Sequence, residues 1–171
     1  MASPFTFLLG GAASGKSALA EARVCTMPQP WVYIATAQAF DAEMTAKIDR
    51  HRGRRGTGWQ TVEAPLDLPA AIKGCTEGTV LVDCVTLWLS NLLLAEQDLD
   101  AAQAALLAAI STSPLPVFVV SNEVGQGLVP DNVLGRRFRE AQGRLNVALA
   151  ARADTVAQVI AGLPNILKGQ L

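Results

Sequence analysis

The chain has few of the residues that mark several common protein classes. Its three cysteines, Cys25, Cys75 and Cys84, form no C-x-x-C pair, which argues against a disulfide framework or a zinc site. The formal net charge is −1, so no excess of basic charge attracts nucleic acid or an anionic membrane. Beyond the N-terminal segment, the longest apolar run covers residues 85–95, contains polar residues and is too short to cross a bilayer.

These absences favour a protein of a reducing, cytoplasmic compartment that binds no nucleic acid and has no stable membrane insertion. The apolar N-terminal run also lacks the basic residues of a signal peptide. Half of the 171 residues are apolar and only 17% are charged, a composition typical of a folded protein with one substantial core. Because no repeat or low-complexity linker divides the sequence, we expect residues 1–171 to form a single domain.

The most informative motif is Gly10-Gly11-Ala12-Ala13-Ser14-Gly15-Lys16-Ser17, which matches the phosphate-binding pattern G-x-x-x-x-G-K-[ST]. It follows an apolar run at residues 5–9, typical of a buried strand, and precedes a helical pattern at residues 18–23. Backbone N–H groups and a helix N-terminus in this arrangement hold phosphate oxygens. Lys16 is expected to reach the terminal phosphates, and the Ser17 hydroxyl is expected to ligate Mg²⁺.

Apolar runs alternate with helical patterns along most of the chain. The runs that predict strands are residues 5–9, 31–34, 79–82, 117–120 and 155–160, and helical patterns cover residues 100–110 and 132–152. In the second helical pattern, the residues expected on one buried face are Val133, Phe138, Leu145 and Leu149. The alternation predicts an α/β fold with a mainly parallel sheet and helices on both faces. Right-handed crossovers then bring the carboxyl ends of the strands to one edge, where a ligand binds.

Polar residues end two of the predicted strands. Asp83 closes one of them, and an acid at that place beside a phosphate loop contacts Mg²⁺ directly or through water. A helix-capping aspartate is the alternative. Asn122 and Glu123 end another strand at the same edge, and either substrate contact or turn formation explains them.

The densest charge cluster is Arg50-His51-Arg52-Gly53-Arg54-Arg55-Gly56, which holds the only histidine. Guanidinium groups suit phosphate oxygens, and arginines this close repel one another unless an anion lies among them. The segment is a solvated basic loop, a lid that closes over phosphates, or the carrier of a nucleophile, His51, that attacks a nucleotide phosphate. From the residues alone the lid ranks first and the nucleophile third.

Two residues that follow the basic segment also have alternative roles. Trp59 is either a core residue, which is the usual case, or a stacking surface. Glu63 is either a surface acid or the acceptor for the paired N–H donors of a guanine. The sequence alone does not choose between these roles.

Together these motifs resemble the bifunctional adenosylcobinamide kinase / adenosylcobinamide-phosphate guanylyltransferase family of cobalamin biosynthesis. Many enzymes share the phosphate loop, whereas two blocks are specific to the family: His51-Arg52 with Trp59-x-Thr61-x-Glu63, and Ser121-Asn122-Glu123-Val124-Gly125. Further blocks match in order over nearly the whole chain, at residues 32–37, 41–48, 81–92, 127–130, 137–146 and 162–168.

The resemblance implies a RecA-like P-loop fold, usually assembled as a homotrimer, and two reactions. Adenosylcobinamide is phosphorylated with ATP or GTP, and GMP is then transferred from GTP to adenosylcobinamide phosphate. In the family the histidine that matches His51 carries GMP covalently, which moves the nucleophile to first place. The resemblance also places a set of residues in the nucleotide site: residues 10–17, Thr36, Ala37, Arg52, Arg55, Glu63 and Asp83.

Two positions depart from the family pattern. Ala13 stands where the family loop usually has arginine, so we expect weaker phosphate or subunit contacts unless Arg50 or Arg54 supplies the charge. Gly56 stands where the family tends to have proline, so we expect a more flexible loop. The alternative function is a simple small-molecule kinase with residues 50–56 as a lid and no covalent step. A GTP switch is disfavoured because the sequence lacks the [NT]-K-x-D motif.

Overall fold

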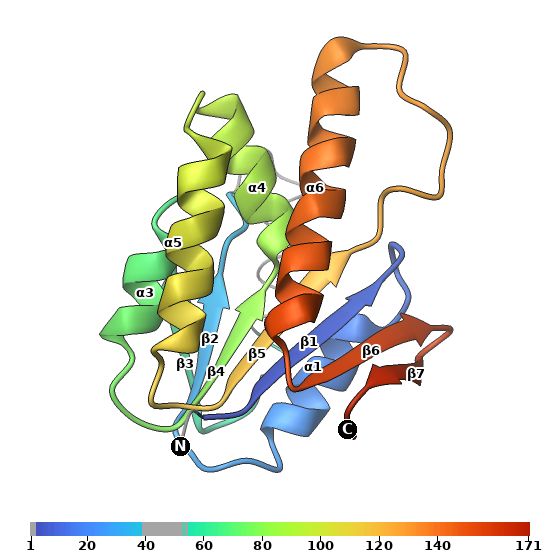
Figure 1. Cartoon of the computed structure of the whole chain (residues 1–171). Helices are drawn as coiled ribbons and strands as arrows, with labels where there is room; N and C mark the ends of the chain where they lie inside the picture. Colours follow the sequence, from blue (N-terminus) through green and yellow to red (C-terminus); the bar gives the residue numbers. More distant parts are fainter. Residues whose placement is uncertain (1–2, 39–52, 54) are drawn as a thin grey trace.

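The structure is a computed structural model that describes residues 3–38, 53 and 55–171. Within these ranges seven strands form one sheet in the order β3-β2-β4-β5-β1-β6-β7 (Figure 1). Neighbouring strands are parallel except β6 and β7, which are antiparallel. The strands are β1 Phe5–Gly10, β2 Trp31–Ala35, β3 Trp59–Glu63, β4 Thr79–Asp83, β5 Val117–Asn122, β6 Thr155–Ile160 and β7 Leu163–Lys168.

Helices cover both faces of the sheet, as the sequence predicted. Helix α1, Lys16–Val24, packs on one face with Ala20 and Val24 fully buried. The helices on the other face are α3 Leu68–Gly74, α4 Val85–Leu94, α5 Leu99–Ser111 and α6 Val133–Arg152 (Figure 1). Two hydrophobic cores result, one under α1 and a larger one under the other four helices. Among the described residues no helix is both long and apolar enough to span a bilayer.

The central strands are apolar on both sides because both sides are covered. Phe7 and Leu8 are successive residues of β1 and therefore point to opposite faces, yet neither is exposed to solvent. This explains why the predicted strands lack clean apolar–polar alternation. The arrangement confirms the α/β class with a mainly parallel sheet.

The predicted burial of one residue of α6 is wrong. Leu145 and Leu149 are fully buried and Phe138 packs against the larger core, but Val133 is 72% exposed. Val133 is the first residue of the helix, and α6 begins beyond the edge of the sheet, as Figure 1 shows. The later apolar positions of the pattern face the core, but the sheet does not extend far enough to cover the first turn.

The parallel strands place their carboxyl ends along a single edge of the sheet. The β-register aligns Glu63 of β3 with Ala35 of β2, and Ala35 in turn with Asp83 of β4. Further along the same edge, Asn122 of β5 aligns with Gly10 of β1. The sheet thus brings the phosphate loop and the predicted polar residues to one edge, which is where ligands bind in open α/β sheets.

Candidate nucleotide-binding site

The phosphate loop connects β1 to α1 and leaves the start of α1 open to a ligand. Gly15 is the N-cap of the helix, with φ 90°, and no side chain caps the first turn. In contrast, Asp67, Asp98 and Asn132 cap α3, α5 and α6 with side-chain hydrogen bonds. An uncapped helix N-terminus keeps N–H donors and positive partial charge available to an anion.

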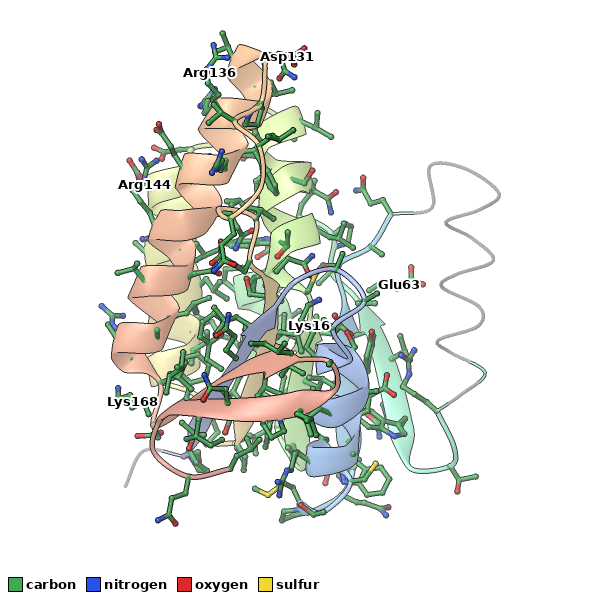
Figure 2. All side chains as sticks on the ribbon, turned by 90° about the vertical axis from the view of Figure 1, so that its right-hand side faces the viewer. Lys16, Glu63, Asp131, Arg136, Arg144 and Lys168 are labelled. Carbon is green, nitrogen blue, oxygen red and sulfur yellow. The ribbon has the colours of Figure 1, made fainter. Side chains whose placement is uncertain are left out.

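Lys16 is the first residue of α1 and lies against the loop. Its side chain is largely buried, and Nζ donates to the Gly11 carbonyl oxygen at 3.0 Å. Ser17 follows in the first helical turn and is half-buried. Figure 2 shows Lys16 and Glu63 on the same side of the molecule, at the edge where the phosphate loop ends. The predicted phosphate-binding lysine and the predicted guanine-binding acid therefore share one edge.

Glycines shape the loop through close backbone approaches. A Cβ at Gly10 would lie 2.5 Å from the Val159 carbonyl oxygen of β6, so no side chain fits there. A Cβ at Gly15 would lie 2.9 Å from Cα of Gly162, in the turn between β6 and β7. Ala13 adopts the left-handed conformation, with φ 55°, which non-glycine residues rarely take. The loop conformation is thus imposed by its neighbours as well as by its own sequence.

Asp83 ends β4 on the face of the sheet that carries α1. Its Oδ2 accepts a hydrogen bond of 3.1 Å from the Tyr33 hydroxyl. Burial and the Asp83 charge together raise the pKa of the Tyr33 phenol, so the phenol stays protonated and donates. Asp83 is followed by Cys84, the N-cap of α4, which has no side-chain cap. The Asp83 carboxylate therefore lies at the sheet edge and does not cap the next helix through a hydrogen bond.

The thiol of Cys84 is buried and poorly suited to act as a nucleophile. Burial and the neighbouring Asp83 charge raise its pKa to about 11, so the thiol is protonated at neutral pH.

The backbone of Cys84 is held by Thr36, whose hydroxyl donates to the Cys84 carbonyl at 2.6 Å and accepts from the Cys84 N–H at 3.0 Å. The Asn91 amide donates to the Thr36 carbonyl at 2.8 Å. The fully buried Thr36 side chain thus fixes the end of β4.

The two polar residues at the end of β5, Asn122 and Glu123, have different roles. The carboxylate of Glu123 accepts a 2.5 Å hydrogen bond from the Gly125 N–H, and the Glu123 N–H donates to the Gly10 carbonyl. Glu123 therefore forms the turn. The backbone of Asn122 is held on both sides, by the Thr86 hydroxyl at its N–H and by the Asn146 amide at its carbonyl. Its half-buried side chain is left at the edge beside the phosphate loop.

A buried polar network behind Asn122 joins β5 to α6. The Ser121 hydroxyl donates to Asn146 Oδ1 at 2.6 Å, and Gln142 Nε2 lies 2.9 Å from both the Ser121 oxygen and Asn146 Oδ1. All three side chains are buried. From the sequence, this block could be identified only as a family motif. Neutral polar residues at helical spacing are compatible with either a buried network or a solvated face.

Arg55 and Trp59 lie beside Tyr33 on the α1 face. The Arg55 guanidinium is 3.6 Å from the centroid of the Tyr33 ring, and its Nη1 lies 3.8 Å from Glu21 Oε1 of α1. Trp59 contacts Trp31 and lies edge-on to Tyr33, with ring centroids 5.6 and 6.1 Å apart. Trp59 is thus packed in the aromatic part of the smaller core, as the core interpretation predicted.

Several predicted site residues lie outside the described residues: Arg50, His51, Arg52 and Arg54. Ala37 is described and half-buried just beyond β2. Glu63 is exposed at the end of β3. Among the residues that the structure describes, no group of three or more histidine, cysteine, aspartate or glutamate side chains gathers as a metal cluster. The oxygen groups suited to a magnesium ion are the Ser17 hydroxyl and the Asp83 carboxylate, a sparse protein contribution typical of Mg²⁺ bound with a nucleotide.

The strand–loop–helix arrangement at a parallel sheet edge defines a P-loop nucleotide-binding protein. A solved structure of a protein from Pyrococcus horikoshii OT3 has the same fold, with a TM-score of 0.59 at 9% identity over 99% of this chain and 88% of that one. A model of the family "Cobinamide kinase / cobinamide phosphate guanyltransferase" matches residues 6–167. The chain belongs to this family.

Curated relatives are similar over nearly their whole length. The "Bifunctional adenosylcobalamin biosynthesis protein CobP" of Pseudomonas aeruginosa is 46% identical over 167 residues, which cover 95% of this chain and 96% of that protein. The "Bifunctional adenosylcobalamin biosynthesis protein CobU" of Salmonella typhimurium is 39% identical, covering 90% and 94%. Family membership makes this chain an enzyme of cobalamin biosynthesis with cobinamide kinase and cobinamide phosphate guanylyltransferase activities, as the sequence motifs predicted.

Proposed function

We propose that the chain performs both reactions at the sheet edge and that GMP transfer proceeds through a covalent bond to His51. The observation that carries the proposal is the uncapped α1 N-terminus with the loop of residues 10–17, on the same sheet edge as Asp83 and Glu63. This edge holds a triphosphate in reach of one end of the basic segment, because Arg55 packs on Tyr33 of β2. The nucleotide substrates are GTP and ATP.

The phosphate-binding part of the mechanism uses the loop and two oxygen groups. Loop N–H groups and Lys16 bind the phosphates, which concentrates positive charge where negative charge develops. The Ser17 hydroxyl and Asp83 are the side chains that would hold Mg²⁺, directly or through water. When bound, this ion would neutralise phosphate charge. Asp83 lies at the carboxyl end of β4 and its Oδ2 is oriented by Tyr33, which fits this role.

The remaining nucleotide contacts come from the flanks of the edge. Glu63 would accept hydrogen bonds from the paired donors of guanine, which adenine lacks in that pattern. Thr36 and Ala37 would contribute at the end of β2, where the Thr36 side chain is already engaged with Cys84, so its contribution would come through the backbone. Arg52 and Arg55 would stabilise the site from the basic segment.

GMP transfer then takes two displacements. A neutral His51 ring nitrogen attacks the α-phosphorus of GTP, forming an N–P bond as the bond to the pyrophosphate oxygen breaks and pyrophosphate leaves. A phosphate oxygen of adenosylcobinamide phosphate next attacks the same phosphorus. The N–P bond breaks, the imidazole leaves as its ring is protonated, and adenosylcobinamide-GDP forms. Adenosylcobinamide and its phosphate are therefore the successive acceptors.

Incubation with GTP labelled at the α-phosphate tests the covalent step directly. We expect label that stays on the denatured protein, survives base and is lost in acid, the behaviour of a histidine phosphoramidate. The His51→Ala variant should retain none. Equal label in that variant, or no label on the parent protein, would exclude the covalent step and favour the simple kinase in which residues 50–56 act only as a lid.

We further propose that residues 1–171 form one domain, that three copies assemble into a homotrimer, and that the enzyme works in the cytoplasm. Support for assembly comes from large exposed apolar side chains on α6 and β7, including Val147, Leu163 and Leu167. Sedimentation equilibrium should give about three times the 18.0 kDa of the chain. A mass of one chain at micromolar concentration would contradict the trimer.

A further inference from the structure

The only tyrosine of the chain contacts two groups of the nucleotide site at once. Its hydroxyl donates to Asp83 Oδ2 at 3.1 Å, and the face of its ring lies 3.6 Å from the guanidinium carbon of Arg55. Tyr33 itself is only 6% exposed. A buried side chain with few rotamers that contacts two charged groups restricts the orientation of both.

The surroundings of Tyr33 leave the ring little freedom. Tyr33 points to the α1 face from the middle of β2, and Leu81 is its partner on β4, two residues before Asp83. Trp59 of β3 approaches the ring edge-on, with an interplanar angle of 75°. Trp59 and Asp83 therefore restrain the ring and its hydroxyl, while the Arg55 guanidinium lies over the ring face.

Arg55 also contacts a third element of the fold, helix α1. Its side chain is only 5% exposed, and Nη1 lies 3.8 Å from Glu21 Oε1. Glu21 belongs to α1, the helix that begins in the phosphate loop. A guanidinium between an aromatic face and a carboxylate has both an electrostatic and a stacking partner. Arg55 thus ties β2 to α1 on the side of the sheet where Asp83 lies.

We propose that Tyr33 is a positioning residue for both reactions: its hydroxyl orients the Asp83 carboxylate, and its ring holds Arg55 in place. The inference rests on the proposed function, since it assigns Asp83 to the magnesium-bound nucleotide and the basic segment to GMP transfer. Arg55 follows His51 by four residues in the sequence, so holding Arg55 tethers the chain that carries the proposed nucleophile. Arg55 then serves the site chiefly as an anchor.

Two substitutions separate the two contacts. Tyr33→Phe removes the hydroxyl and keeps the ring, whereas Tyr33→Leu removes both. We expect Tyr33→Phe to raise the Mg²⁺ concentration for half-maximal kinase activity about three- to tenfold, and to shift by the same factor the Mg²⁺ dependence of thermal stabilisation by GTP. Saturating Mg²⁺ should restore labelling of the protein by α-labelled GTP in Tyr33→Phe. It should leave labelling of Tyr33→Leu at least tenfold slower than in the parent protein.

Arg55→Gln tests the second contact alone, because it removes the charge and keeps the aromatic group intact. It should reproduce the labelling defect of Tyr33→Leu with the Mg²⁺ dependence of the parent protein. Circular dichroism and urea melts of each variant show whether it is folded. An unchanged Mg²⁺ requirement in Tyr33→Phe, or parental labelling in folded Arg55→Gln, would overturn the inference.

The experiment also distinguishes failure of the inference from failure of the proposed function. If the parent protein carries no GMP label, the covalent step is wrong, but the thermal shift with Mg²⁺ and GTP still measures the Tyr33–Asp83 contact. A shifted Mg²⁺ dependence in Tyr33→Phe would then support that contact. Identical behaviour of Tyr33→Phe and the parent protein in that assay would refute it.

Discussion

The backbone N–H of Gly162 donates a 2.7 Å hydrogen bond to the carbonyl oxygen of Ser14. Ser14 lies in the phosphate loop near the N-terminus, and Gly162 lies in the turn between the last two strands. Ala161 and Gly162 both have positive φ, 51° and 79°, as a tight two-residue hairpin turn requires. The tip of the C-terminal hairpin therefore supports the loop that is proposed to bind phosphate.

Substitutions of the two glycines at this contact should differ in severity. Gly15→Ala adds a Cβ that would lie 2.9 Å from Gly162 Cα and requires φ 90° of a non-glycine residue, so we expect at least a tenfold loss of GTP affinity. Gly162→Ala meets no atom within 4 Å and should cost only about 1–2 kcal/mol of stability through its backbone conformation. Isothermal titration with GTP and urea unfolding measure the two effects.

Gly143→Ala is the matched control for this pair. Gly143 lies in α6 in a helical conformation, and an added Cβ would meet nothing within 4 Å. Alanine should therefore stabilise the protein by up to about 1 kcal/mol, with GTP affinity unchanged. A drop in GTP affinity in this variant would show that the affinity loss of Gly15→Ala is not specific to the phosphate loop.

Ala13 carries a conformational cost that glycine would relieve. A left-handed alanine costs about 1–2 kcal/mol, and glycine recovers most of this but adds flexibility to the unfolded chain. We expect Ala13→Gly to change the free energy of unfolding by less than about 1 kcal/mol, in the stabilising direction. Ala13→Val should destabilise by more than about 1 kcal/mol, because a β-branched residue tolerates this conformation poorly. Urea melts of the three proteins give the comparison.

The buried network behind β5 should be costly to interrupt. Asn146→Ala removes the partners of Ser121, Gln142 and the Asn122 carbonyl together, so we expect a loss of about 2–4 kcal/mol. Asn165→Ala, at an exposed position of β7, should change stability by less than about 0.5 kcal/mol. Equal effects of the two substitutions in thermal or urea unfolding would contradict a stabilising network.

GMP labelling should depend on pH in the direction set by the imidazole. Only the neutral ring can attack phosphorus, so the labelling rate should fall tenfold for each pH unit below the histidine pKa, near ~6.5 in an unperturbed residue. Rapid-quench labelling between pH 5 and 8 measures this profile. A rate that stays flat down to pH 5 would point to a group other than His51, or to a strongly lowered pKa.

The sequence predicted the strands that are buried on both faces, because continuous apolar runs have no other stable place in an α/β protein. It also predicted α5 and α6, whose observed starts at Leu99 and Val133 lie within one residue of the predicted patterns. Helix α4 was recognised only as an apolar run. Because this helix is buried on nearly all sides, it lacks the apolar stripe that reveals an amphipathic helix.

The two edge strands, β3 and β7, were not predicted, for a different reason. In β3 all residues except Trp59 are exposed, and β7 is exposed throughout and contains Pro164, which an edge strand tolerates. Helix α3 is short and was missed, although Asp67 with proline in the first turn is a usable start signal. At the site, the Tyr33–Arg55 contact joins a residue of β2 to one in the segment before β3, and no spacing rule could have revealed it.

The position of β6 has a consequence for how the enzyme is made. Strand β1 pairs with β5 on one side and with β6 on the other, and the hairpin tip at Gly162 holds the loop that follows β1. During synthesis, the first strand must therefore wait for residues 155–168 to leave the ribosome before its second edge is paired and its loop is supported. A nascent chain whose residues 155–168 have not yet left the ribosome should not retain GTP.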